Sequence, residues 1–122
     1  MDFFFICPKG IRVGYPSAAL LRSLSKRERH AVKGRAVILL TANRHYALRG
    51  VKPGTRLAKV RRRVHVSRGY KIGLNTWYLV SNGASRGVLK VRHGVILEIG
   101  IANKQLTAGS TRATARFLKA FR

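Results

Sequence analysis

The clearest pattern of hydrophobic and polar positions lies between residues 74 and 101. Residues 75–80 are rich in aromatic and β-branched side chains, and in the runs 88–92 and 95–101 every second residue is leucine, isoleucine or valine. A period of two is typical of strands with one buried face. Turn residues separate the runs. The pattern therefore predicts a three-stranded antiparallel meander near the C-terminal end of the chain.

The same pattern predicts the register of the second hairpin. A three-residue loop that ends with Gly94 in the left-handed conformation places Val91 opposite Val95 and Leu89 opposite Leu97. A two-residue turn would instead pair a leucine with a glutamate and mix the two faces. We therefore expect the longer loop.

A repeated pattern extends over most of the chain, from residue 10 to residue 106. Residues 10–14 and 50–54 share the order glycine, β-branched, basic, any residue, glycine, and each is followed by a helical pattern and then by strand-like sequence. Ser17 and Thr55 are suited to cap the two helices. The apolar stripes are Leu20, Leu21 and Leu24 in the first helix, and Leu57, Val60 and Val64 in the second. The pattern predicts an internal repeat, with units at 10–49 and 50–106.

The remaining elements complete an α+β domain. The apolar run 3–7 is expected to form a first strand of the sheet, the alternative being that the chain is a fragment of a longer exported precursor. Residues 36–41 and 45–51 are strand-like, and 110–121 has the pattern of a final amphipathic helix. We expect one domain over 1–122, with a mainly antiparallel sheet and two to three short helices packed on one face.

The net charge of the chain is far more positive than is usual for a domain of this size. The 122 residues are 46% hydrophobic, enough for one core, but 26 Lys and Arg stand against 3 acids, giving a formal net charge of +23. Self-repulsion at that charge opposes compaction, so a polyanionic partner is expected, the alternative being a basic chain from an arginine-rich proteome. Cys7 is the only cysteine, which excludes an internal disulfide, and no apolar run is long enough for a transmembrane segment.

The supply of acidic residues argues against catalysis. Asp2, Glu28 and Glu98 are the only carboxylates, and the four histidines have no metal-ligand spacing. We expect Glu28 to pair with an arginine on a helix surface and Glu98 to face Lys or Arg across strands. No enzymatic activity, metal site or cofactor is expected. An RNase-like pair drawn from His45, His65 and a tyrosine stays open as the alternative.

Clusters of basic residues indicate nucleic acid, or a ribonucleoprotein, as the partner. Exposed lysines and arginines contact phosphates, and interleaved aromatic rings stack on unpaired bases. The candidate phosphate contacts are Arg56, Lys59, Arg61, Arg62, Arg63, Arg68, Lys71, Arg112, Arg116 and Lys119. The candidate stacking residues are Tyr46, Tyr70 and Tyr78, for each of which a place in the core or at its edge is the alternative.

A family resemblance suggests another function. The glycine-bracketed turn, short helix, Trp77-Tyr78 strand and the hairpin at 90–95 resemble the small α/β modules of β-lactamase inhibitor proteins and outer-membrane assembly lipoproteins, mostly over residues 50–101. Nearly the whole chain also resembles basic modules of uncharacterised secreted actinobacterial proteins. The resemblance implies a non-catalytic module that binds a protein partner, or the cell envelope, through its sheet face. Nucleic-acid binding predicts a cytoplasmic protein, whereas this alternative predicts a secreted or cell-surface one.

Overall fold

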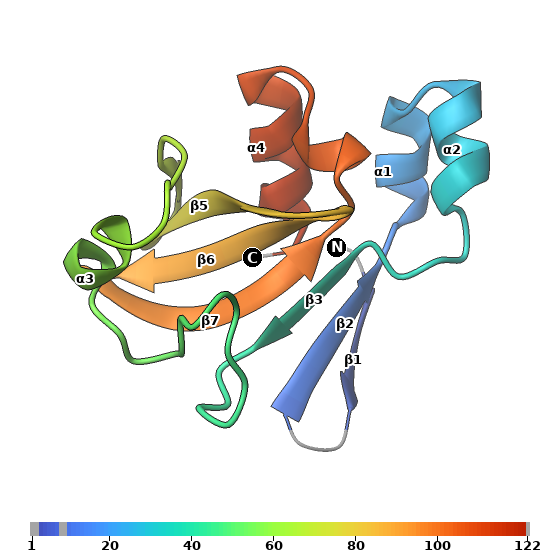
Figure 1. Cartoon of the computed structure of the whole chain (residues 1–122). Helices are drawn as coiled ribbons and strands as arrows, with labels where there is room; N and C mark the ends of the chain where they lie inside the picture. Colours follow the sequence, from blue (N-terminus) through green and yellow to red (C-terminus); the bar gives the residue numbers. More distant parts are fainter. Residues whose placement is uncertain (1–2, 8–9, 122) are drawn as a thin grey trace.

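One antiparallel sheet organises the molecule. The structure, a computed structural model, describes residues 3–7 and 10–121, with side chains from residue 10 onward. Within these residues seven strands pair in the order β1-β2-β3-β7-β6-β5-β4 (Figure 1). The strands are β1 (Phe3–Cys7), β2 (Ile11–Tyr15), β3 (Ile38–Thr41), β4 (Tyr70–Ile72), β5 (Asn75–Asn82), β6 (Ser85–Arg92) and β7 (Val95–Ala102). The expected first strand and C-terminal meander, β5-β6-β7, are confirmed.

Short helices complete the α+β fold that the sequence predicts. They are α1 (Ala18–Ser23), α2 (Lys26–Val32), α3 (Leu57–Arg61) and α4 (Thr111–Ala120), with a 3-10 turn, η2 (Gln105–Thr107), before α4. Helices α1, α2 and α4 lie along one side of the sheet, and α3 lies at the far end (Figure 1). None of the helices in the described range is long and apolar enough to cross a membrane.

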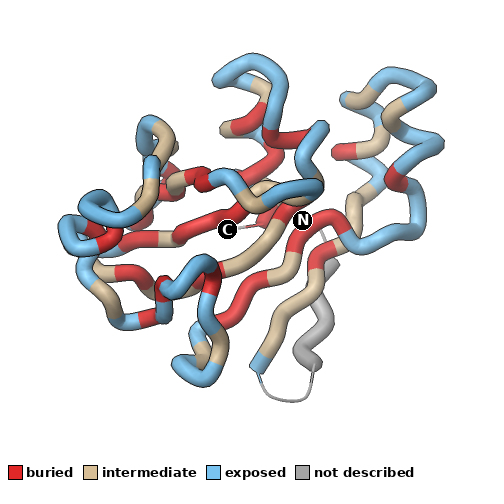
Figure 2. The backbone as a smooth tube through the Cα atoms, viewed as in Figure 1, coloured by how far each residue is buried: buried red, intermediate tan, exposed pale blue. Residues whose placement is uncertain are grey.

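The sheet has a core on each face. Val88 and Leu89 are neighbours on β6 and therefore point to opposite faces, and each belongs to a different cluster of buried residues. The α4-side core contains Leu20, Ile72, Trp77, Val88, Phe117 and Phe121. The α3-side core contains Leu48, Val51, Leu57, Val60, Leu89 and Ile99. Most of the buried strand residues lie in β3, β5, β6 and β7, whereas most helix surfaces and loops are exposed (Figure 2). Helices therefore cover both faces, which corrects the expected packing of all helices on one face.

The register predicted for the β6–β7 hairpin is wrong. Arg92 pairs with Val95 across a two-residue turn, in which His93 (φ 51°) and Gly94 (φ 73°) both have left-handed conformations. Such a turn matches the twist of the flanking strands. Gly94 has the expected conformation, but the loop is one residue shorter than predicted.

A β-bulge explains how the shorter turn keeps the faces unmixed. Val91 pairs with Ile96, but the next pair is Lys90 with Glu98, so Leu97 is an extra residue on β7. The extra residue shifts the rest of β7 by one position relative to β6. The alternating apolar residues of the two strands therefore point to the same face again. Leu89 consequently pairs with Ile99 in the α3-side core.

Other local expectations in the N-terminal two thirds are also corrected. The first predicted helix is two helices, because Ser25 begins a new one. Residues 11–14 belong to strand β2, whereas 50–54 form turns, so the two glycine-bracketed segments differ in conformation. Residues 45–51 form no strand: residues 45, 49 and 50 are turn, and a single bridge joins Leu48 to Val51. Arg56, without a side-chain capping bond, precedes α3 in place of Thr55. The internal repeat stays a sequence-based prediction.

Candidate nucleic-acid interface

Helix α3 is fixed to the sheet by backbone pairing with the start of β7. The Gly54 N–H donates to Ile96 O (2.7 Å), the Ile96 N–H to Thr55 O (2.9 Å), and the Leu57 N–H to Gly94 O (2.8 Å). Leu57 and Val60 are buried beneath the helix, as their predicted stripe requires.

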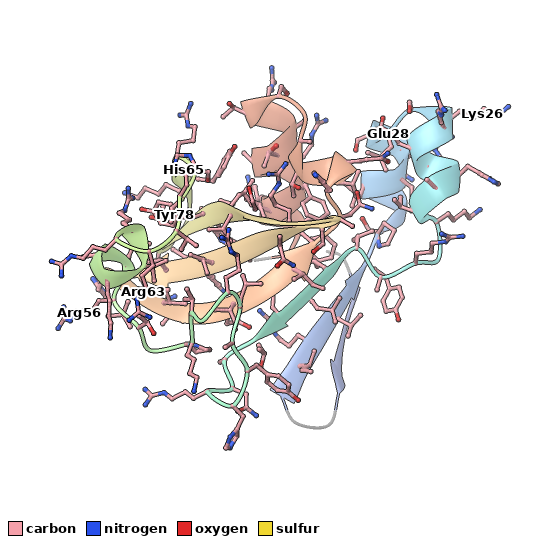
Figure 3. All side chains as sticks on the ribbon, in the orientation of Figure 1. Lys26, Glu28, Arg56, Arg63, His65 and Tyr78 are labelled. Carbon is pink, nitrogen blue, oxygen red and sulfur yellow. The ribbon has the colours of Figure 1, made fainter. Side chains whose placement is uncertain are left out.

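Five exposed cations lie on α3 and on the residues that flank it, and we call them the α3 cluster: Arg56, Lys59, Arg61, Arg62 and Arg63. Arg56 and Arg63 are exposed and lie at the end of the sheet that carries α3 (Figure 3). The predicted exposure of these residues is therefore observed, and the backbone pairing described above holds the cluster on a fixed base.

The segment after α3 runs beside β5. The Ser67 N–H donates to Leu79 O, and the Leu79 N–H donates to Ser67 Oγ, each at 2.9 Å. This pairing holds Arg68 exposed between α3 and β4. A Cβ at Gly69 would lie 2.7 Å from Thr76 Cγ2, so only glycine allows the segment to come this close to the sheet.

Three further predicted cations surround one hollow between β4 and α4. Lys71, Arg116 and Lys119 line it together with Ile72, Gly73 and Ala115, and its volume is about 290 Å³. We call it the β4–α4 hollow. Ile72 and Phe117, in the same core cluster, join the two elements that carry these cations. Arg112 is exposed on α4 but does not line the hollow.

Glu98 neutralises cations on the sheet rather than at these surfaces. Its carboxylate accepts from Arg12 Nη2 (2.6 Å), Arg12 Nε (3.1 Å) and Lys90 Nζ (3.3 Å). The side chains of Glu98 and Lys90 are 12% and 13% exposed. Lys90 Nζ also lies 5.5 Å from the centre of the Trp77 ring, within the range of a cation–π contact. The expectation that Glu98 faces Lys or Arg across strands is confirmed.

Glu28 has a different role from the one expected. It forms a capping box with Ser25: the Ser25 N–H donates to Glu28 Oε1, and the Glu28 N–H donates to Ser25 Oγ, each at 3.2 Å. The hydrogen bond from the Ser25 side chain, helped by the one from its backbone, lowers the pKa of Glu28 below its usual 4.5. Asp2 lies outside the described residues. Among the described residues, the α3 cluster and the β4–α4 hollow have no carboxylate in an ion pair with them.

The three tyrosines predicted to stack on bases lie in separate places. Tyr78 packs against the α3-side core, and the Arg61 guanidinium lies 5.3 Å from the centre of its ring. Tyr46 packs against the same core but lines an apolar groove of about 180 Å³ with Ile11 and Ile101. Tyr70 packs on the opposite face. Each is therefore partly engaged in packing, as the alternative interpretation states.

Two cations that the sequence did not single out lie near α3. A Cβ at Gly54 would be 3.1 Å from Arg44 Nη2, so a loop brings Arg44 beside the start of α3. Arg92 Nε donates to Asn75 Oδ1 at 2.8 Å, in the hairpin whose turn is bonded to α3. Both placements come from contacts between distant segments, for which the local sequence carries no signal.

No group of three or more His, Cys, Asp or Glu side chains that could hold a metal ion occurs among the residues with described placement. Comparison of the chain with protein-family models, with curated proteins and with solved structures found no match. The resemblance to inhibitor-like modules therefore stays a prediction, and function is inferred from the chemistry of the surface.

Proposed function

We propose that the protein binds nucleic acid, alone or in a ribonucleoprotein, through the α3 cluster and the β4–α4 hollow, and that it catalyses no reaction. The observation that supports the proposal is the separation of charges. In the described residues one carboxylate is used inside the sheet and another in a helix cap, so the exposed cations on α3, β4 and α4 are left for an external anion.

A phosphate backbone fits this surface because the charges are exposed, numerous and carried by fixed elements. Lysine and arginine contacts to phosphates release condensed counterions, which gives affinity that falls steeply with salt. Such contacts set the position of the protein but carry no base sequence information. Arg61 and Tyr78 together present a guanidinium stacked on a ring, so this part of the surface contributes positive charge rather than a free aromatic face.

The test compares two double variants with equal loss of charge. Arg62→Gln with Arg63→Gln removes two exposed cations from the α3 cluster, and Lys26→Gln with Arg27→Gln removes two from α2. Lys26 lies at the other end of the molecule from Arg56 and Arg63 (Figure 3). For the α3 variant, the slope of log affinity against log salt should become shallower by up to about 1.8 on duplex DNA and about 1.4 on a single strand.

The α2 variant is the control and should leave the slope nearly unchanged. Binding is measured by fluorescence anisotropy at several salt concentrations, with a neutral polymer as a second control. Absence of salt-dependent binding to DNA and RNA would contradict the proposal. Equal effects of the two variants would show that net charge alone, and not the α3 surface, governs binding.

A further inference from the structure

The β4–α4 hollow differs from the α3 cluster in geometry. The cations of the α3 cluster extend outward from one convex helix, whereas Lys71, Arg116 and Lys119 converge on one concave space from two elements. Arg116 and Lys119 are three residues apart on α4 and therefore lie on the same side of that helix. A hollow of about 290 Å³ is large enough to take a phosphate group with the sugar to which it is attached.

The charge around this hollow favours a doubly charged ligand. Three cations line it, and among its lining residues there is no carboxylate. Glu28 lines a neighbouring hollow that shares Arg116, and it is already bonded to Ser25. A phosphodiester supplies one negative charge, whereas a phosphomonoester supplies between about 1.5 and 2 at neutral pH and has three free acceptor oxygens. The monoester therefore offsets more of the repulsion among the three cations.

The turn at the edge of the hollow supplies a second feature. Gly73, with φ +62°, begins the two-residue connection between β4 and β5, and Leu74 follows it. Leu74 is 81% exposed and is the one large hydrophobic side chain recorded as exposed among the described residues. An apolar side chain beside a cationic hollow suits a ligand in which a phosphate is joined to a less polar group, as in a terminal nucleotide.

We infer that the β4–α4 hollow binds a phosphomonoester, and that in nucleic acid this group is the terminal phosphate of a strand. This inference rests on the proposed function for its ligand source. It adds that the protein distinguishes strand ends from internal phosphates, whereas the α3 cluster binds both alike.

The experiment uses the full chain and three oligonucleotides of one sequence, bearing a phosphate at the 5′ end, at the 3′ end or at neither. Either the 5′-phosphorylated or the 3′-phosphorylated strand should bind about tenfold more tightly than the unphosphorylated strand. This is the gain in affinity expected from one or two charge-assisted hydrogen bonds. Lys71→Gln and Lys119→Gln should each reduce this preference. The matched control, Lys59→Gln on α3, should weaken all three strands equally and keep the preference.

A pH series separates a monoester from general charge. The second pKa of a phosphomonoester is about 6. The preference for the phosphorylated strand should therefore be complete at pH 8 and should decline as the pH falls through about 6. Binding of the unphosphorylated strand, whose diesters do not titrate there, should change less. Equal affinity of the wild-type protein for all three strands, or a preference that Lys71→Gln leaves intact, would overturn the inference.

Failure of the site can be distinguished from failure of nucleic-acid binding. If no oligonucleotide binds, the proposed function is wrong. The hollow is then tested by thermal unfolding in inorganic phosphate against chloride at equal ionic strength, and by sedimentation with vesicles containing phosphatidic acid or phosphatidylglycerol. Stabilisation by phosphate that Lys71→Gln removes would support a phosphate site, and its absence would overturn it. A preference for phosphatidic acid alone would support the monoester chemistry and overturn its assignment to strand ends.

Discussion

The Glu98 cluster, formed by Arg12, Lys90 and Glu98, and the α3 cluster use the same basic residue types in opposite ways. In the first, two largely covered cations share one carboxylate on the face of the sheet. In the second, all five cations are exposed and have no carboxylate in an ion pair with them among the described residues. Desolvation explains the difference, because a charge removed from water needs a partner, whereas an exposed one is stabilised by solvent and counterions.

This comparison shows how a chain with 3 acids and 26 basic residues can fold. Glu98 lies where β2 and β6 bring Arg12 and Lys90 together on the face of the sheet. We expect the loss of this carboxylate to reduce stability more than the loss of Glu28. The remaining positive charge lies on surfaces where it costs little and can meet a polyanion. Variants that change one cluster and leave the other intact test this division.

The largest expected effect follows from Glu98→Gln. The change removes the carboxylate that Arg12 and Lys90 share, and the Arg12 side chain is 27% exposed. Because Arg12 is partly exposed, the free energy of unfolding should fall by about 2–3 kcal/mol, at or just below the low end of the range for breaking a buried pair. Urea denaturation should show a lower midpoint with an unchanged slope. A shift no larger than that of Glu28→Gln would show that the Glu98 cluster does not stabilise the fold.

A smaller change in the free energy of unfolding, of opposite sign, is expected when charges are removed from the β4–α4 hollow. Lys71→Gln with Lys119→Gln removes two converging like charges, so in the absence of any anion it should stabilise the fold by about 0.5 kcal/mol. The gain should disappear near 1 M salt, where the Debye length is only about 3 Å. Thermal unfolding at low and high salt measures it. A loss of stability at low salt would mean that these lysines hold β4 or α4 in place.

Smaller still is the effect on stability expected in the α3 cluster. Arg62→Gln with Arg63→Gln, the pair used above for binding, should change the free energy of unfolding by less than about 0.5 kcal/mol, as is usual for exposed positions. Chemical denaturation without nucleic acid provides the measurement. A larger loss would make weakened DNA binding by this variant a consequence of unfolding.

The smallest effect concerns Glu28, which caps a helix on the surface. Its pKa is lower in the folded protein, so the ionised form adds stability that is present above pH 4.5 and lost as the pH falls through the folded-state value. Glutamine can also serve in a capping box, so Glu28→Gln should be nearly neutral. The small advantage of the wild-type protein at pH 7 should vanish at pH 3 in thermal unfolding. An advantage that grows on acidification would contradict this.

The sequence predicts the fold class and the meander because alternation is a local property of each strand. It does not predict the hairpin register, because two registers keep the apolar faces separate and the choice depends on the bulge at Leu97. The strand start is also bonded to Gly54 and Thr55, a non-local contact. By contrast, the break between α1 and α2 does have a local signal, since Ser25 and Glu28 have the spacing of a capping box.

The exposed face of α3 is also predictable from a local pattern, because Leu57 and Val60 define the buried stripe and leave the cations outside. The hollow that joins Lys71 to Arg116 and Lys119 is not, because it depends on β4 packing beside α4. The pairing of Arg61 with the ring of Tyr78 likewise requires the segment after α3 to lie along β5. The residue types thus identify the candidate surface. Tertiary contacts determine that it consists of an exposed α3 cluster and a separate β4–α4 hollow.

If the protein binds nucleic acid as proposed, many copies would bind to one polymer, and strand β4 would then have a further consequence. It is an edge strand of three residues with Lys71 at its centre, and Ser67 covers the edge of β5 beyond it. Open edges promote pairing between sheets of neighbouring molecules, which short strands and lysines oppose. Phosphates would screen that lysine while raising the local concentration of the protein. The brevity of β4 would then oppose pairing between crowded copies at this edge of the sheet.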